Sequence, residues 1–138
     1  MNSILRMRVP SSMKEVRRLN DSAARFLQEH RASAASIHDV QLVLEEMTTN
    51  VIRHAAPLQG VLTMQVELEV EPAGVRVRVE DDGAAFDPTT APVQRAGRPM
   101  NGGSGGFGLR IIRRTAIGLD YRRHDNPNCF ELLVPFTQ

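Results

Sequence analysis

A chain of 138 residues, 41% hydrophobic and 24% charged, is long enough for one globular domain and too short for two. We therefore expect residues 1–138 to form a single domain. The formal net charge of +1 excludes a strong bulk attraction to nucleic acid or to an anionic membrane. Because Lys14 is the only lysine, the chain also lacks a P-loop, whose phosphate-binding motif requires a lysine after its second glycine.

The sequence has none of the features of a secreted or membrane-spanning protein. The single cysteine, Cys129, excludes an intramolecular disulfide bond and suits a reducing compartment. The N-terminal residues contain no apolar stretch of signal-peptide length, and no segment approaches the roughly 20 apolar residues that a membrane span needs. We expect the protein to be cytoplasmic.

The N-terminal part of the chain predicts a short strand followed by a helix. The strand covers residues 4–9, because Pro10 cannot continue a central ladder. Ser11 or Ser12 can then cap a helix, since both residue types accept hydrogen bonds from the first free N–H groups. The apolar residues of this helix recur at helical spacing and are Val16, Leu19, Ala23, Phe26 and Leu27.

A second helix is predicted from about residue 36 to residue 56. Pro57 follows it and helps to stop it, because proline disrupts the hydrogen bonding of a helix interior. The side predicted to be buried carries Val40, Val43, Leu44, Met47, Val51 and Ala55.

Two strands with strict alternation come next. The first covers residues 62–70, and its inward positions are Leu62, Met64, Val66, Leu68 and Val70. Residues 71–74 are typical of a turn, so the following strand should return antiparallel. In that strand Val75, Val77 and Val79 alternate with charged residues, and the same period places Asp81 on the inward face. A carboxylate there needs a partner, because burying it unpaired costs free energy.

Residues 84–104 show no periodicity and are interrupted by prolines and glycines, which is typical of a functional lid or a disordered loop. Helical spacing resumes at Leu109, Ile112 and Ala116, and Gly118 is expected to end this helix. Residues 119–123 are predicted to form a strand, and residues 126–128 a turn. The last strand has Phe130, Leu132, Val134 and Phe136 in alternation. This order of elements predicts an α+β fold: a two-layer α/β sandwich with a mostly antiparallel sheet and helices on one face.

Glu46 and Asn50 form the first motif that can carry chemistry. They lie four residues apart on the second predicted helix, so their side chains share a face about 6 Å apart along its axis. The amide oxygen can bind Mg²⁺, and the carboxylate can act as a general base. On its own the spacing also fits two polar residues at the edge of a core.

Asp81 and Gly83 form the second motif. A buried carboxylate can accept a hydrogen bond from the exocyclic amine of adenine, and a glycine lets a flat base approach the backbone. The alternative is an Asx-turn that simply ends the strand.

The third motif, residues 105–109, opens the next helix with Gly105, Gly106 and Gly108. Free N–H groups and the positive end of the helix dipole suit a phosphate group there. A glycine hinge is the alternative, and Phe107 is expected to be a packing anchor. His54, one turn after Asn50, could touch a ligand, and a capped or core histidine is the alternative. His30, His38 and His124 show no metal-ligand spacing with one another or with Cys129, so a zinc site is not expected.

These three motifs, in this order, resemble those of the GHKL ATPase superfamily, which DNA gyrase, the histidine kinases, a heat-shock chaperone and mismatch-repair proteins share through the Bergerat ATP-binding fold. The chain length and layout are most similar to the small bacterial anti-sigma factors that are also serine-protein kinases. The amino-acid sequences of residues 46–55, 81–88 and 106–112 are close to those of that family. The resemblance covers essentially the whole chain.

The resemblance implies an enzyme that transfers the γ-phosphate of ATP to a serine of an anti-anti-sigma protein with a STAS domain. That protein and a sigma factor would compete for the kinase, so phosphorylation would control transcription. In this family's pattern Asn50 holds Mg²⁺ and Glu46 is the catalytic base. Asp81 recognises adenine, and Gly83 lies beneath the base. The other nucleotide contacts implied for ATP or ADP are Arg53, His54, Ala85, Phe86, Gly105, Gly106, Phe107, Gly108 and Leu109. A homodimer is also implied, and the apolar faces of the first strand and first helix could support it.

Two departures from the family's pattern keep alternatives open. Ala85 stands where a second glycine is common, and residues 101–104 lack the arginine that often lies near the γ-phosphate. The nearest arginines are Arg95 and Arg98. A nucleotide-binding anti-sigma or adaptor module without kinase activity is therefore the alternative function. The catalytic domain of a histidine kinase is less favoured, because no phospho-accepting helix pair precedes the first strand in this sequence.

Overall fold

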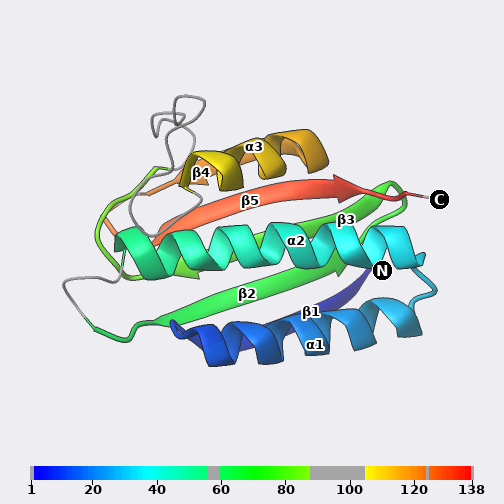
Figure 1. Ribbon diagram of the computed structural model, residues 1–138, viewed down its shortest axis with the longest axis horizontal. Helices are drawn as coiled ribbons and strands as arrows, with labels where there is room; N and C mark the ends of the chain where they lie inside the picture. The colour runs from blue at the N-terminus through cyan, green and yellow to red at the C-terminus, as the bar shows by residue number, and fades with distance from the viewer. Residues whose placement is uncertain (1, 56–59, 88–104, 124, 138) are drawn as a thin grey trace.

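The computed structural model describes residues 2–55, 60–87, 105–123 and 125–137, and over these residues the fold has two layers (Figure 1). One layer is an antiparallel sheet with strand order β1-β2-β3-β5-β4, and helices cover one of its faces. The predicted α+β sandwich is confirmed. The elements are the strands β1 (Ser3–Pro10), β2 (Thr63–Val70), β3 (Gly74–Asp81), β4 (Ile117–Arg122) and β5 (Asn128–Pro135), the helices α1 (Met13–Glu29), α2 (Ala34–Asn50) and α3 (Gly105–Thr115), and the π-helical segment η1 (Val51–Ala55).

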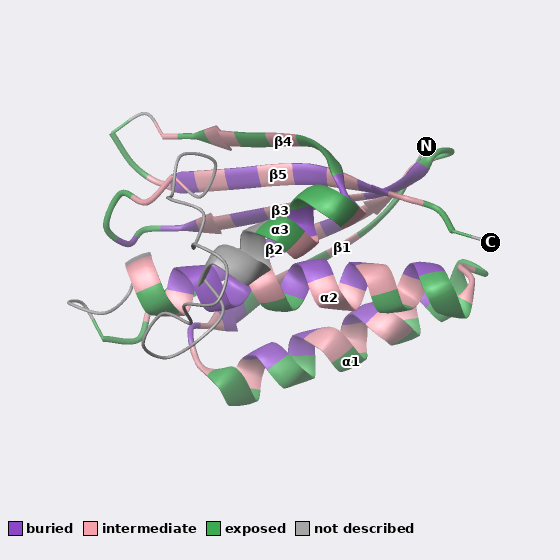
Figure 2. Cartoon of the chain, turned by 45° about the horizontal axis from the view of Figure 1, so that its top comes forward, coloured by how far each residue is buried: buried purple, intermediate pink, exposed green. Residues whose placement is uncertain are grey.

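The hydrophobic core lies between the sheet and the helices (Figure 2). Alternate residues of β2, β3 and β5 are buried there, as a period of two requires. Leu62 and Val70, which share the phase of β2, are only half-buried: Leu62 precedes the strand, and Val70 is its last residue. The buried apolar residues of these strands are Met64, Val66, Leu68, Val75, Val77, Val79, Phe130, Leu132 and Val134.

The two serines after β1 have different roles. Ser12 caps α1, and its Oγ accepts a hydrogen bond from the Glu15 N–H at 3.4 Å. Ser11 is buried, and it joins β1 to the start of β2 through hydrogen bonds in both directions with Leu62. The predicted apolar stripe of α1 is buried except at Phe26, which is half-buried beside the ring of His30.

α2 begins two residues earlier than predicted, because Ser33 caps it by accepting the Ser36 N–H at 3.1 Å. Its α-helical part also ends earlier, at Asn50, where the chain changes to the π-helical segment η1. The hydroxyls of Thr48 and Thr49 donate to carbonyls one turn back, at 2.7 Å each, and such bonds bend helices. The predicted helix end at residue 56 lies outside the described residues.

Two expectations about the C-terminal third are wrong. Gly118 does not end a helix, since α3 stops at Thr115 and Gly118 lies inside β4 with φ of +66°, where the pairing with β5 shifts register. Phe136 does not continue the buried face of β5 and is 40% exposed. β5 ends at Pro135, opposite the first residue of β3, and the N–H of Phe136 donates to the carbonyl oxygen of Ala73 in the turn before β3.

The loop expected to act as a lid lies almost entirely outside the described residues, because residues 88–104 are not among them. Within the described ranges, no helix is both long enough and apolar enough to cross a membrane.

Candidate functional site

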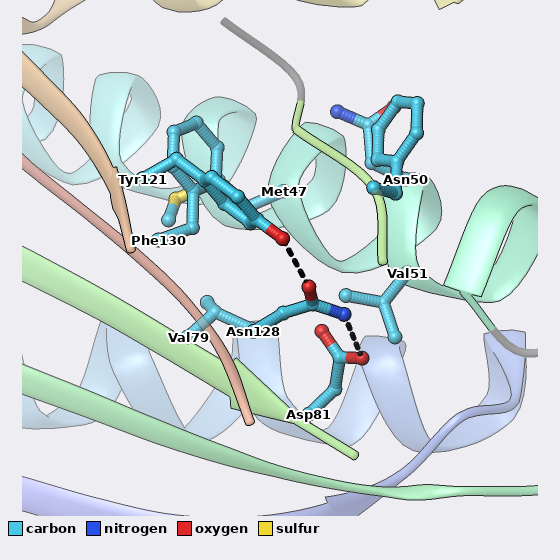
Figure 3. A pocket seen from close by; sticks show the side chains of 9 residues that line it. Met47, Asn50, Val51, Val79, Asp81, Tyr121, Asn128 and Phe130 are labelled. Carbon is cyan, nitrogen blue, oxygen red and sulfur yellow. Dashed lines mark hydrogen bonds between the residues drawn. The ribbon is translucent and has the colours of Figure 1, made fainter. Parts of the chain in front are cut away.

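A pocket opens between the C-terminal end of α2 and the inner face of the sheet (Figure 3). The empty space between these elements is about 320 Å³, a volume that includes open solvent at the mouth. Apolar side chains form most of the wall, and a few polar groups converge on it. The lining residues are Met47, Asn50, Val51, Val79, Asp81, Phe86, Tyr121, Asn128 and Phe130.

Asp81 is the last residue of β3 and faces inward, as the alternation in that strand predicts. It is 5% exposed. Its Oδ1 accepts hydrogen bonds from the backbone N–H of Gly83 at 2.8 Å and from Nδ2 of Asn128 at 2.9 Å. Burial raises the pKa of Asp81 above its ordinary value, although these two hydrogen bonds and the charge of Arg123 oppose the rise. Asp81 therefore forms an Asx-turn and also lines the pocket, although the sequence pattern gave these two roles as alternatives.

Asn50 and Glu46 occupy different positions relative to the pocket. Asn50 ends α2, is 7% exposed and lines the pocket. Glu46 lies one turn earlier, is half-buried and is not among the described residues of the lining. Burial, reinforced by the charge of Glu45, raises the pKa of Glu46, while Arg53 opposes the rise. A carboxylate with a raised pKa holds a proton more firmly, which suits a general base near neutral pH.

η1 carries two of the predicted nucleotide contacts. Arg53 is exposed, and His54 is half-buried with its ring stacked on Phe86. Burial lowers the pKa of His54, and the charge of Arg53 lowers it further. π-helical turns occur often at functional sites, and this one follows Asn50 directly.

The remaining predicted residues follow β3 or begin α3. Gly83 is buried, whereas Ala85 is exposed beside Phe86. The backbone of Gly105, Gly106, Phe107, Gly108 and Leu109 forms the start of α3, so the predicted glycine-rich helix entry is confirmed. The side chains of these five residues lie outside the described set, and their role toward phosphate stays a prediction.

Three polar residues at or beside the pocket were not among the predicted site residues: Tyr121, Arg123 and Asn128. Asn128 was assigned only to a turn, yet it is 4% exposed and starts β5 in phase with Phe130 and Leu132. That phase is a signal that could have revealed it. Tyr121 and Arg123 lie on or just after β4, whose alternation is interrupted at Gly118, and no comparable signal marks them.

A sequence profile of the histidine kinase-like ATPase domain family matches residues 9–133. The chain therefore belongs to this family of ATP-binding domains, and the resemblance read from its three motifs is confirmed. A curated relative, the serine/threonine-protein kinase BtrW of Bordetella bronchiseptica, is 30% identical over 99 residues, which cover 71% of this chain and 70% of the relative.

Two solved structures share the fold. The RsbU and RsbW domains of a Mycobacterium tuberculosis protein match with a TM-score of 0.65 and 14% identity, over 99% of this chain. The present chain spans 33% of that protein chain. The SiaB–SiaC complex from Pseudomonas aeruginosa matches with a TM-score of 0.63 and 19% identity, over 94% of this chain and 88% of that chain. At these identities the similarity establishes the fold.

Proposed function

We propose that this protein is an ATP-dependent serine-protein kinase and anti-sigma factor that phosphorylates a STAS-domain anti-anti-sigma protein and sequesters a sigma factor. One observation carries the proposal: Asn50 and Asp81, from separate motifs, line a single pocket in a histidine kinase-like ATPase domain. The name of BtrW as a serine/threonine-protein kinase supports the activity. The SiaB–SiaC complex supports a protein partner for this fold.

In this proposal the adenine of ATP enters the pocket edge-on to Asp81. The carboxylate accepts a hydrogen bond from the exocyclic amine, while Gly83 leaves room for the ring beside the backbone. Val79, Met47 and Phe130 provide the apolar walls that a flat ring needs. The phosphates then extend toward the N-terminus of α3, where backbone N–H groups of Gly105 and its neighbours favour negative charge.

Asn50 is the residue that would hold Mg²⁺. The Asn50 side chain is a suitable ligand for this ion, because its amide oxygen lies at the pocket wall and Mg²⁺ prefers oxygen ligands. Among the described residues, no three histidine, cysteine or carboxylate side chains gather to hold a metal by themselves. Asn50 would therefore share the ion with water and the phosphates of ATP, whose negative charge the ion offsets.

Glu46 would accept the proton of the substrate serine. It lies one turn from Asn50 on α2, so a serine hydroxyl near the phosphates can approach both residues. Kinases act mainly by positioning and by charge stabilisation, and a site with one base and few other reactive groups suits this chemistry.

The regulatory part of the proposal is partner exchange. The unphosphorylated STAS protein and the sigma factor would compete for this kinase, and phosphorylation would release the STAS protein. A homodimer would form through β1 and α1, since β1 is an edge strand of the sheet and exposes Ile4. The alternative is a nucleotide-dependent anti-sigma module without phosphate transfer, which the lack of an arginine in residues 101–104 favours.

Phosphate transfer can be tested with γ-labelled ATP, Mg²⁺ and a fractionated lysate of the source organism. Three proteins are compared at a pH above the acid limb of the rate profile, where Glu46 is deprotonated whether or not Glu45 is charged: the wild type, Glu46→Gln, and Glu45→Gln as a matched control on the exposed side of α2. We expect one small labelled protein with the wild type and the control, and a loss of about 100-fold or more in labelling with Glu46→Gln. Bound ATP without any label would support the alternative function. Equal labelling by all three proteins would exclude Glu46 as the base.

A further inference from the structure

We propose that Asn128 is a positioning residue that fixes Asp81 as a hydrogen-bond acceptor toward the pocket, with Tyr121 and Arg123 holding the Asn128 amide in the required orientation. The consequence is selectivity for a purine with an exocyclic amine over one with a carbonyl oxygen at that place. This inference rests on the proposed nucleotide binding and adds residues that the sequence motifs do not contain.

The Asn128 side chain is hydrogen-bonded at both ends (Figure 3). Its Nδ2 donates to Oδ1 of Asp81 and to the carbonyl oxygen of Ala84, both at 2.9 Å. Its Oδ1 accepts from Nη1 of Arg123 at 3.0 Å and from the hydroxyl of Tyr121. These contacts join β3, β4 and β5 at the floor of the pocket.

Arg123 determines which way the amide faces. A guanidinium has donors and no acceptor, so only the oxygen of Asn128 can face it. Turning the amide by half a turn would set its NH₂ group against the guanidinium of Arg123. The same turn would set its oxygen against the carboxylate of Asp81 and the carbonyl of Ala84. The NH₂ group of Asn128 is therefore committed to Asp81.

The hydrogen bond from the Asn128 NH₂ group determines which oxygen of Asp81 can bind a ligand. Within the described residues, the Asn128 amide and the Gly83 N–H both reach Oδ1, and neither reaches Oδ2. Hydrogen bonds from donors favour the charged carboxylate, and they oppose the rise in the pKa of Asp81 that burial causes. A charged Asp81 accepts the amine of adenine, and it repels the carbonyl oxygen that guanine presents at the equivalent position.

Asn128→Asp tests this role because it keeps the size of the side chain and the acceptor for Arg123. It replaces the donor toward Asp81 by a second carboxylate, and two adjoining carboxylates share a proton at low pH and repel at high pH. Asn126→Asp is the matched control, since it makes the same change at an exposed residue of the same turn. The measurement is binding of ADP and of GDP by calorimetry between about pH 6 and about pH 8.

We expect the wild type and Asn126→Asp to prefer ADP over GDP at every pH, with little change in ADP affinity. For Asn128→Asp, ADP affinity should fall by about tenfold or more as the pH rises, and the preference over GDP should shrink. A folded Asn128→Asp variant with the wild-type pH profile and preference would overturn the inference. A wild type that binds neither nucleotide would instead overturn the proposed function, and this inference with it.

Arg123→Gln is a second variant that adds no charge beside Asp81, with Arg122→Gln as its control. Arg122 is exposed and pairs with Asp120, away from the pocket. Arg123→Gln should lower the ratio of ADP to GDP affinity several-fold, because the amide of Asn128 is no longer held in one orientation. An unchanged ratio in Arg123→Gln, with Asn128→Asp unfolded, would also overturn the inference.

Discussion

The imidazole ring of His54 stacks on the phenyl ring of Phe86, with ring centroids 4.2 Å apart and an angle of 12° between the planes. His54 belongs to η1, directly after α2, whereas Phe86 follows β3 and lines the pocket. The stack therefore connects the two segments that carry Asn50 and Asp81, and it contains an imidazole, the side chain whose ordinary pKa lies closest to neutral pH.

His54 should make stability depend on pH. Its pKa is lowered from 6.5 by burial and by Arg53, so the unfolded chain binds this proton more tightly than the folded protein does. The neutral ring of His54 contributes stability at pH values above its pKa in the unfolded chain. This contribution is lost as the pH falls through the lower pKa of His54 in the folded protein. His54→Phe keeps an aromatic stack and removes the titration, so part of the acid-induced loss should disappear.

Urea unfolding at a series of pH values measures this effect, with His38→Phe on the exposed side of α2 as the control. The difference in the free energy of unfolding between His54→Phe and the wild type should grow as the pH falls from about 7 to about 5. A difference that is constant over this range would show that His54 does not titrate differently on folding.

The inward position of Asp81 illustrates what local patterns can predict. Each side chain in a strand faces opposite to its neighbours, so Val75, Val77 and Val79 determine the direction of Asp81 without further information. Helical spacing likewise places Glu46 and Asn50 on one face of α2. It cannot predict that only Asn50 lines the pocket, because that depends on where η1 and the strands lie.

The partnership of Asp81 with Asn128 could not be predicted in the same way. The two residues lie opposite each other in the β3–β5 ladder, and that register is set by pairing between strands far apart in the sequence. The local sequence around Asn128 and Pro127 is typical of a turn, which obscures the phase of the strand that follows. The same limitation applies to η1, since apolar spacing predicts one continuous helix and carries no signal for a π-helical turn.

Asp81→Asn should separate binding from stability. The variant retains an oxygen for the donors from Gly83 and Asn128 but loses the carboxylate charge that we propose accepts adenine, so ADP affinity should fall by about tenfold or more. Burial raises the pKa of Asp81, so its charged carboxylate costs stability in the folded protein, and a neutral amide at this position removes that cost. The free energy of unfolding of Asp81→Asn should therefore equal or exceed that of the wild type.

Calorimetry with ADP and urea unfolding at neutral pH measure both quantities for Asp81→Asn. Asp82→Asn, at the exposed neighbouring position, is the control and should change neither by much. Wild-type ADP affinity in Asp81→Asn would mean that this carboxylate does not contact the nucleotide.

Glu45 should influence the pH dependence of phosphate transfer through Glu46. Its negative charge helps to raise the pKa of Glu46, so Glu45→Gln should lower that pKa. A base works only when it is deprotonated, and the acid limb of the rate profile should therefore move to lower pH in this variant. The rate on the plateau above the limb should stay at the wild-type value. An acid limb at the same pH in both proteins would mean that Glu46 does not control it.

Gly74 should be less tolerant of substitution than Gly118. A Cβ added there would lie 2.2 Å from the carbonyl oxygen of Val134 and 2.8 Å from Cα of Pro135, both backbone atoms of the paired strand β5. Gly74→Ala must separate β3 from β5 at this end, and we expect it to lower the free energy of unfolding by about 3 kcal/mol. Gly118→Ala is the comparison, since a Cβ there meets nothing within 4 Å and the positive φ alone costs about 1 kcal/mol. Urea unfolding of the two variants ranks them, and a Gly118→Ala variant less stable than Gly74→Ala would show that the strands separate at little cost.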